Sequence, residues 1–232
     1  MAISTAVTRT DELYARIRGD ILGGRLVPGE HLRFPQLPQH YEASVGATRE
    51  VLTRLAADGL VLSEARRGYR VRPLSHSDLL ELTQARVEQE SLVLRLSITD
   101  GDTSFEAQAV AAHHMLERAP YLDEADPSHP TPVWAAAHAA FHEALLAGCA
   151  NRRLLATALS LRAEAELYRA WGVAFGGDSG HDVAQEHRML LHHTVGRDTD
   201  AAVQLLRDHI AHTAQLLISC APDQPNRIAA AT

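Results

Sequence analysis

The sequence predicts a mainly α-helical protein in two parts, a small N-terminal part that ends in a β-hairpin and a larger part built only from helices. Three observations carry this prediction. Apolar residues recur at helical spacing over most of the 232 residues. The two-residue alternation of strands occurs only between Val61 and Arg72. The net charge changes from +3 over residues 1–74 (11 Arg against 8 acidic residues) to −10 over residues 75–232 (11 Arg against 21).

The composition is that of an ordinary folded protein, with 46% hydrophobic and 22% charged residues. No apolar run reaches the roughly 18 residues of a membrane-spanning helix, and the N-terminus lacks the apolar core of a signal peptide. Two cysteines, Cys149 and Cys220, give no disulfide framework, which fits a reducing compartment. We therefore expect a cytoplasmic protein. The basic N-terminal part favours nucleic acid at that end, because phosphate contacts dominate such affinity.

A first helix is expected directly after Thr8. Thr8 and Asp11 have the spacing of an N-terminal capping box. The apolar face of this helix carries Leu13, Ile17 and Ile21. Glycines and a proline then break the helix, and a second short helix is expected around residues 36–41.

A third helix, expected over residues 46–58, has two unlike faces. Its apolar face consists of Val51, Leu52, Leu55 and Ala56. Arg49, Thr53 and Arg54 lie on the opposite face. Ser44 stands where it caps the helix or donates to an anion. Such a helix suits the major groove of DNA, although an ordinary surface helix shows the same pattern.

Two short strands follow this helix. They are expected at Val61–Glu64 and Tyr69–Arg72, joined by a turn through residues 65–68 that contains two arginines. Three helices followed by a hairpin with an arginine-rich tip form a winged helix-turn-helix. This is the fold that we predict for residues 1–74.

The N-terminal part resembles the GntR family of bacterial transcription regulators. Similarity to the family's opening lies in LYARIRGDILGGRLVPGEHL, and similarity to its recognition helix and wing lies in REVLTRLAADGLV and RRGYRVRPL. The resemblance covers residues 10–75 and implies that the following residues touch DNA: Ser44, Arg49, Arg66, Arg67 and Gly68. We add Arg54 from the exposed helix face. The family usually has a basic residue where this chain has Val45, so the operator is expected to differ from the common one.

The second part is expected to be an all-helical antiparallel bundle over residues 75–222. A linker at residues 73–77 leads into it. Six helical stretches follow, at 78–99, 104–118, 133–147, 151–175, 182–195 and 199–219. Glycines and prolines separate these stretches, including the pair Gly176-Gly177. No strand pattern is evident here, and residues 223–232 are expected to form a disordered tail.

Histidine is concentrated in the second part, which holds 12 of the 14 in the chain. His138 and His142 are four residues apart on one helix face and can share a metal ion. Composition alone predicts ~0.8 such pairs, so this spacing by itself is weak evidence. Read alone, His187 and His209 are scattered histidines, for which solvated or core roles stay open.

The second part resembles the FCD ligand-sensing domain, which follows the winged helix in the FadR subfamily of GntR regulators. Its central motif is similar to HAAFHEALLAGCANRRL, where His142 matches and His138 stands at the family's aspartate position. Its paired-helix segment is similar to EHRMLLHHTVGRDTDAAVQLLRDH, which places His187 and His209 as the other histidine ligands. The resemblance thus implies a metal site made by these four histidines.

The resemblance also implies the chemistry of this site. Histidine for aspartate at position 138 keeps a ligand but removes one negative charge. A set of three or four histidines suits Zn²⁺, with Ni²⁺, Cu²⁺ or Co²⁺ as alternatives. The stretch RVEQE resembles the domain's first helix and makes Arg86 an expected effector contact. A cation beside an arginine suits a small carboxylate, and many members of the subfamily sense small organic acids.

We therefore expect a homodimeric transcription regulator, a repressor, that binds an imperfect palindrome in double-stranded DNA and responds to a small organic acid. One alternative is a regulator that senses the metal itself. Another is a metal-dependent enzyme, since three histidines and an open position also describe catalytic zinc. The absence of an HExxH motif from the sequence counts against the enzyme.

Overall fold

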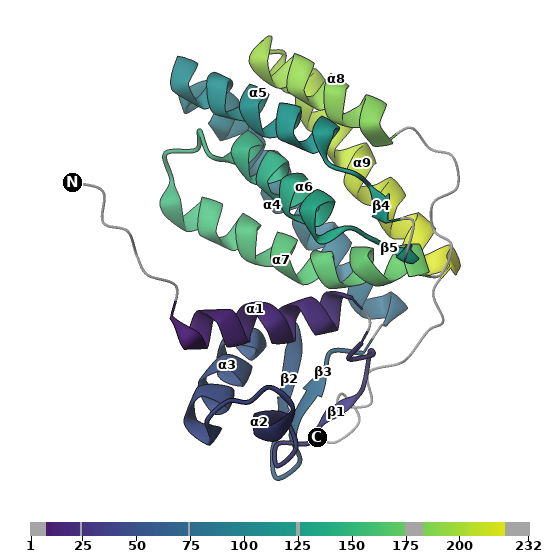
Figure 1. Cartoon of the computed structure of the whole chain (residues 1–232). Helices are drawn as coiled ribbons and strands as arrows, with labels where there is room; N and C mark the ends of the chain where they lie inside the picture. The colour runs from purple at the N-terminus through teal and green to yellow at the C-terminus, as the bar shows by residue number, and fades with distance from the viewer. Residues whose placement is uncertain (1–7, 24, 74, 124–125, 175–182, 221–232) are drawn as a thin grey trace, which may run out of the picture. The chain divides into compact units, whose positions relative to one another are not determined.

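The structure is a computed structural model that describes residues 8–23, 25–73, 75–123, 126–174 and 183–220. These residues divide into two compact units that separate between Ser75 and His76 (Figure 1). The expected tail at 223–232 and the expected break at Gly176-Gly177 lie outside the described residues. Over the part of the chain that is described, no helix is both long and apolar enough to cross a membrane.

The first unit is a three-helix structure with a small sheet. Its elements are α1 (Arg9–Leu22), β1 (His31–Leu32), α2 (Leu37–His40), α3 (Val45–Ala57), β2 (Val61–Glu64) and β3 (Gly68–Val71). The strands are antiparallel in the order β1-β3-β2, and α1 packs on α3. The predicted winged helix-turn-helix is confirmed, with one addition. The sequence did not indicate β1, which pairs only two residues with β3.

Side-chain caps fix where α1 and α3 of the first unit begin. The hydroxyl of Thr8 accepts a hydrogen bond from Asp11 N (3.1 Å), and the Asp11 carboxylate accepts one from Thr8 N (3.3 Å). Ser44 Oγ accepts from Ala47 N (3.1 Å) and starts α3 in the same way. The residues expected on the apolar faces are buried: Leu13, Ile17, Ile21, Val51, Leu52 and Leu55.

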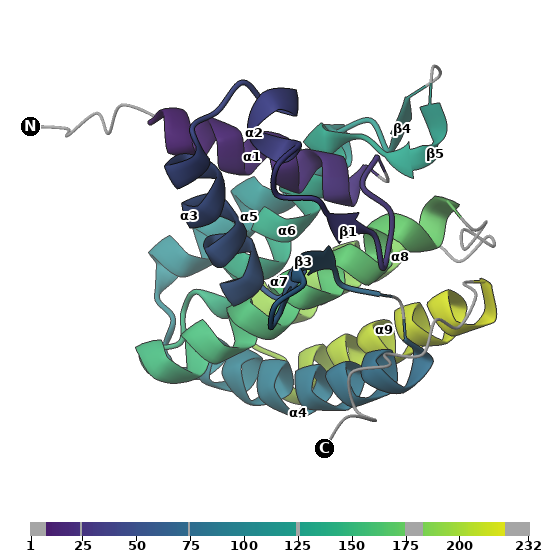
Figure 2. The same ribbon diagram turned by 90° about the horizontal axis from the view of Figure 1, so that it is seen from below.

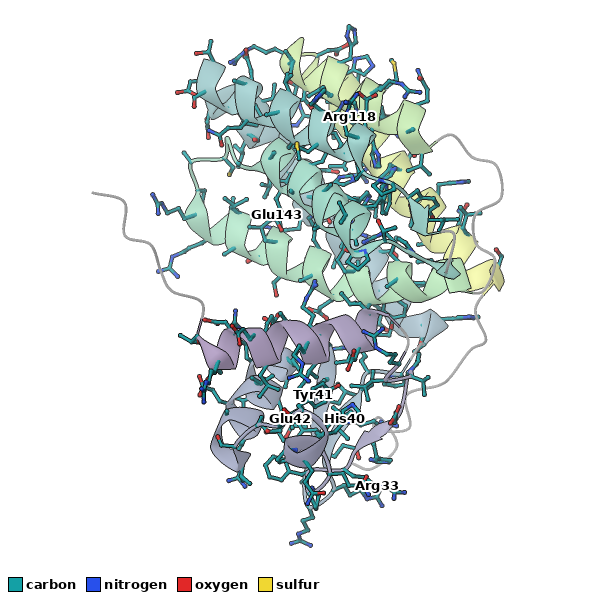
Figure 3. All side chains as sticks on the ribbon, in the orientation of Figure 1. Arg33, His40, Tyr41, Glu42, Arg118 and Glu143 are labelled. Carbon is teal, nitrogen blue, oxygen red and sulfur yellow. The ribbon has the colours of Figure 1, made fainter. Side chains whose placement is uncertain are left out.

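The turn between α2 and α3 holds a non-glycine residue in the left-handed region. Glu42 has φ of 52° and its side chain is exposed. Its neighbour Tyr41 is buried, donates its hydroxyl to Asp20 (2.5 Å) and accepts at its carbonyl from Arg16 (3.1 Å). These contacts hold the turn that leads into α3. Tyr41 and Glu42 are labelled in Figure 3. The strain at Glu42 is therefore maintained by its surroundings.

The second unit is a helical bundle. Its helices are α4 (His76–Asp100), α5 (Thr103–Arg118), α6 (Pro132–Leu146), α7 (Arg152–Ala174), α8 (Val183–Val195) and α9 (Thr199–Cys220). Helix α4 packs against α7 and α9, α5 packs against α6 and α8, and α8 packs against α9. Both views show α4 and α9 side by side (Figures 1 and 2). All six expected helices are present.

The expectation that the second unit contains no strands is wrong. The loop between α5 and α6 contains a short antiparallel hairpin, β4 (Leu122–Asp123) with β5 (Asp126–Pro130). The sequence did not indicate these strands because the stretch contains prolines, which are rare inside paired strands. The hairpin is anchored to the bundle by Thr131, whose hydroxyl donates to Pro120 O (2.5 Å) and accepts from Trp134 N (3.0 Å) at the start of α6.

The core of the second unit joins all six of its helices, with Leu94, Ala109, Phe141, Ala158, Leu190 and Leu206 buried in one cluster. Two helix ends approach closely at Gly148, whose N donates to Ser97 Oγ (2.8 Å). A Cβ at Gly148 would lie 2.5 Å from Ser97 O, so only glycine fits without a backbone shift. This contact fixes the end of α6 against α4 and so sets the position of the side chains that α6 carries.

The strain at Glu42 gives a first prediction. Glu42→Gly should raise the free energy of unfolding by about 1 kcal/mol, because a Cβ in the left-handed region costs about 1–2 kcal/mol and the added freedom of unfolded glycine offsets part of the gain. Thermal unfolding of the whole chain measures this. Glu42→Ala is the matched control, since it removes the charge but keeps the Cβ, and equal stability of the two variants would contradict the explanation.

Candidate functional site

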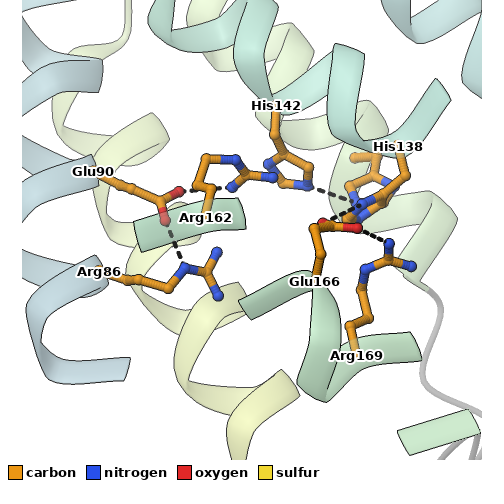
Figure 4. Close-up of polar contacts among 8 residues, drawn as sticks. Arg86, Glu90, His138, His142, Arg162, Glu166 and Arg169 are labelled. Carbon is orange, nitrogen blue, oxygen red and sulfur yellow. Dashed lines mark hydrogen bonds and ion pairs between the residues drawn. The ribbon is translucent and has the colours of Figure 1, made fainter. Parts of the chain in front are cut away.

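Four buried histidines meet inside the second unit. His138 and His142 come from α6, His187 from α8 and His209 from α9. One ring nitrogen from each lies within 4.8 Å of the others, and all four residues are at most 6% exposed. Figure 4 shows His138 and His142 pointing into the space between the helices. The structure therefore brings together the four histidines that the resemblance implied.

Arg197 sets the depth of the two histidines on α8 and α9. It occupies the turn between these helices with φ of 56°. Its guanidinium donates to Ile98 O (3.0 Å), Gly101 O (2.8 Å) and Glu106 Oε1 (2.7 Å) at the end of α4 and the start of α5. Because these hydrogen bonds fix the position of the turn, the positions of α8 and α9 along their axes are fixed as well. His187 and His209 lie at similar distances from the turn, so both reach the cluster.

One pair of ring nitrogens in the cluster has the separation of metal ligands. His142 Nε2 and His187 Nε2 are 3.3 Å apart. Two nitrogens that are each about 2.0–2.1 Å from a zinc ion at the tetrahedral angle are about 3.4 Å apart. The full 4.8 Å spread of the cluster is wider than this, so a metal would draw at least one ring inward. His209 Nδ1 donates to Glu186 Oε2 (2.6 Å), which leaves Nε2 as its ligand atom.

The electrostatics favour the uncharged rings that bind metals. Burial, reinforced by neighbouring positive charges, holds the pKa values of His138 and His142 well below the usual range. Burial also lowers the pKa of His187, to about 2. Neutral imidazoles carry a free lone pair, which is the form that coordinates a metal. Nδ1 of His138 and of His142 is buried without a hydrogen-bond partner among the described residues, and the donor set fits a divalent metal of the zinc type.

A cavity of about 440 Å³ opens onto the histidine cluster, which is the size of a small-molecule site. Its walls include all four histidines and, from α4 and α7, the charged residues Arg86, Arg162, Glu166 and Arg169. The other wall residues are mainly apolar, among them Leu79, Trp134 and Leu217. The cavity thus combines charged residues around the histidine cluster with a mainly apolar lining elsewhere.

Arg86, the expected effector contact, lies on the cavity wall but is partly engaged. Its Nε donates to Glu90 Oε1 (2.7 Å), and Arg162 Nη1 donates to Glu90 Oε2 (2.7 Å). Burial alone would raise the pKa of the Glu90 carboxyl, but the two arginines outweigh it and hold that pKa below its usual value. Glu90 is therefore an ionised bridge between α4 and α7 (Figure 4), and it orients both arginines.

Sequence reasoning did not assign several charged residues to this site. Arg162, Glu166 and Arg169 follow one another at four and three residues on α7, so they share the face that lines the cavity. That spacing was the available signal, although surface helices carry many such charges. Glu186, the partner of His209, directly precedes His187 in the sequence, and only the fold shows that it turns toward α9.

In the first unit, the expected DNA contacts lie at the start of α3 and at the tip of the β2–β3 hairpin. Ser44 and Arg49 are exposed, and Arg49 stacks over the Phe34 ring (5.3 Å). Arg54 is engaged within the unit, because it pairs with Asp11 (2.9 Å) and lies over the Tyr14 ring (4.0 Å). The exposed Val45 is the first residue of α3.

The hairpin tip is an exposed basic turn. Arg66, Arg67 and Gly68 are exposed, and the turn takes positive φ at Arg66 (64°) and Gly68 (88°). The hairpin is joined to α3 by a contact between Thr53 Oγ1 and the Tyr69 hydroxyl (3.3 Å). The start of α3 and the wing tip are thus parts of one rigid unit with basic side chains free of the core.

Comparison with known proteins agrees with both units. Residues 9–71 match the family model of bacterial regulatory proteins of the gntR family, and residues 81–212 match the FCD domain model. An uncharacterized HTH-type transcriptional regulator, BphR of Paraburkholderia xenovorans, is 34% identical over 197 residues, which is 85% of this chain and 80% of the relative. The HTH-type transcriptional repressor GlaR of Escherichia coli is 33% identical over 201 residues, covering 85% of this chain and 90% of the relative.

Solved structures show the same fold. A GntR transcriptional regulator from Rhodococcus sp. RHA1 has a TM-score of 0.69 at 22% identity, covering 92% of this chain and 99% of that one. Because the family and the named relatives are transcription regulators, the metal-dependent enzyme is set aside. The chain belongs to the GntR family of bacterial transcription regulators, and its winged helix is followed by an FCD domain.

Proposed function

We propose that this regulator is a repressor that releases its operator when a small organic acid binds at a metal in the second unit. The observation that carries this proposal is the buried four-histidine cluster at the floor of an arginine-lined cavity. Residues 1–74 would be the DNA-binding domain and residues 75–222 the effector-binding and dimerisation domain. The regulator would act as a homodimer in the cytoplasm, where its DNA is found.

DNA binding would use the start of α3 and the wing. The N-terminal residues of a recognition helix reach base edges, which assigns that role to Arg49, with Ser44 contacting a phosphate. The exposed wing residues Arg66 and Arg67 would contact backbone phosphates, with Gly68 allowing close approach. Arg54 would join them only by exchanging its Asp11 partner for a phosphate.

The metal would be held by His138, His142, His187 and His209, with Glu186 orienting His209. We propose zinc, with nickel as the alternative, because neutral imidazoles suit both ions. When bound, the ion would supply a positive charge to which a carboxylate oxygen of the effector can coordinate. Arg86, held in place by Glu90, would donate to the same carboxylate.

Effector binding has a direct route to the DNA-binding domain through the chain itself. Arg86 lies on α4, which begins at His76, the first residue after the first unit. A ligand that draws Arg86 toward the metal would favour one position of α4 and shift the population of dimer states. In a twofold dimer, this would change the spacing of the two recognition helices and so the affinity for a palindrome.

A second candidate function is sensing of the metal itself. Four protein nitrogens can complete a tetrahedral site without an effector, which is the usual form of a structural zinc site. Titration of operator binding with zinc, in the presence and absence of organic acids, separates the two functions. Release of DNA by zinc alone would favour metal sensing, whereas release that needs an acid would favour metabolite sensing.

Arg49 tests the DNA interface. Arg49→Ala should weaken binding to the operator by about 1–3 kcal/mol, because it removes a base contact. Arg66→Ala should cause a smaller loss that diminishes at high salt, since it removes a phosphate contact. The operator is first selected from random DNA with the whole protein, and affinities are then measured by fluorescence anisotropy. Unchanged affinity of Arg49→Ala, or a single asymmetric half-site, would refute the proposed interface.

The histidines test the metal site. His187→Ala and His209→Ala should each abolish zinc retention and the response to organic acids, because each removes one of the four ligands, the first from α8 and the second from α9. Glu186→Gln should retain zinc with about 10–100-fold weaker affinity. Elemental analysis and competition with a chromogenic chelator measure both. His113→Ala is the matched control, since His113 is buried on the same cavity wall but stands outside the cluster. Loss of zinc in this control as well would show that the effect is structural.

A further inference from the structure

Arg169 is a partly buried cation on the cavity wall, and only part of its hydrogen-bonding capacity is used. Its Nη2 donates to Glu166, while Nε and Nη1 are buried without a partner among the described residues. Its guanidinium lies over the Trp134 ring (5.2 Å), and Trp134 stacks on His138 (4.8 Å). Buried polar groups without partners are rare in folded proteins, so these donors indicate an acceptor that completes the site.

The charges around the histidines are balanced before any metal binds. Three arginines on the cavity wall, Arg86, Arg162 and Arg169, face three carboxylates that contact them or the cluster: Glu90, Glu166 and Glu186. The remaining wall carboxylate, Glu117, is half exposed and lies 3.5 Å from Arg188. A divalent ion would therefore add two positive charges with no protein counter-charge. One carboxylate on the effector neutralises one of them, and two carboxylates neutralise both.

The arginines also lie at two separate places. Arg162 and Arg169 are seven residues apart on α7, which corresponds to a rise of about 10 Å. Arg86 is held beside Arg162 by Glu90. Figure 4 shows Arg86 and Arg162 on the side of His142, and Arg169 with Glu166 beside His138. The cavity thus has two separate arginine positions, and each lies near one of the two histidines of α6.

We propose that Arg169 binds a second anionic group of the effector, and that the effector class is therefore small dicarboxylates. One carboxylate would meet the metal and Arg86, and the other would accept hydrogen bonds from the guanidinium fork of Arg169. Glu166 and Trp134 hold Arg169 in place for this contact. The inference rests on the proposed function, because it extends the same acid-binding site.

The test compares acids that differ by one carboxylate. Straight-chain dicarboxylates of four to six carbons and monocarboxylates of the same lengths are titrated into the whole, zinc-loaded protein by calorimetry. At least one dicarboxylate should bind about 10-fold or more tightly than its monocarboxylate partner. Arg169→Gln should remove this preference, because it weakens dicarboxylate binding much more than monocarboxylate binding. Arg169→Lys keeps the charge but loses the fork, and should give an intermediate preference.

Arg153→Gln is the matched control, because Arg153 is an exposed arginine on the same helix and does not line the cavity. It should behave as the unmodified protein. Monocarboxylates that bind as tightly as dicarboxylates, or a preference that survives Arg169→Gln, would overturn the inference and leave the proposed function intact. Failure of every acid to bind the zinc-loaded protein would overturn both. Should Arg169→Gln not fold, the Arg169→Lys variant and the ligand comparison on the unmodified protein still decide the result.

Discussion

The second unit depends on a single constraint: the ionisable groups that its helices bury must form ion pairs and hydrogen bonds with one another. Glu90 is fully buried, and it stays ionised because Arg86 and Arg162 each donate a hydrogen bond to one of its two carboxylate oxygens. Breaking such a pair leaves an unpaired buried charge, which costs about 3–5 kcal/mol. Helices α4 and α7 are therefore joined at one fixed level. The same bridge orients the arginines beside the histidine cluster, so the groups that stabilise the bundle also shape its cavity.

Local chemistry made much of the architecture predictable. The Thr8–Asp11 box and the Ser44 cap were readable because a cap and its helix are a few residues apart, and both form as expected. The six bundle helices were readable because their apolar periodicity and the glycines and prolines between them are also local signals. The four histidines were different, because spacing alone could not join α6 to α8 and α9. The family resemblance supplied that link, and the fold shows the convergence.

Contacts between distant segments were not predictable. Arg54 reads as a free cation on a helix face, yet it pairs with Asp11, 43 residues earlier. Arg169 reads as one more surface charge, and only its burial against Trp134 distinguishes it. The β4–β5 hairpin escaped notice because its prolines mask a strand pattern. In each case, the residue's contact partner lies on another helix or strand, and no short-range sequence pattern identifies that partner.

The stacking of Trp134 on His138 has an optical consequence. The two rings are 4.8 Å apart and nearly parallel, at 22°, so the indole lies in contact with the first histidine of the cluster. We expect its emission to respond to a change in the electronic state of that imidazole. Since Arg169 lies over the same indole, the signal would report on the histidine cluster and on the Arg169 side of the cavity. With Trp171 replaced by phenylalanine, Trp134 becomes the single tryptophan of the chain, and its selectively excited emission is an intrinsic probe of cavity occupancy.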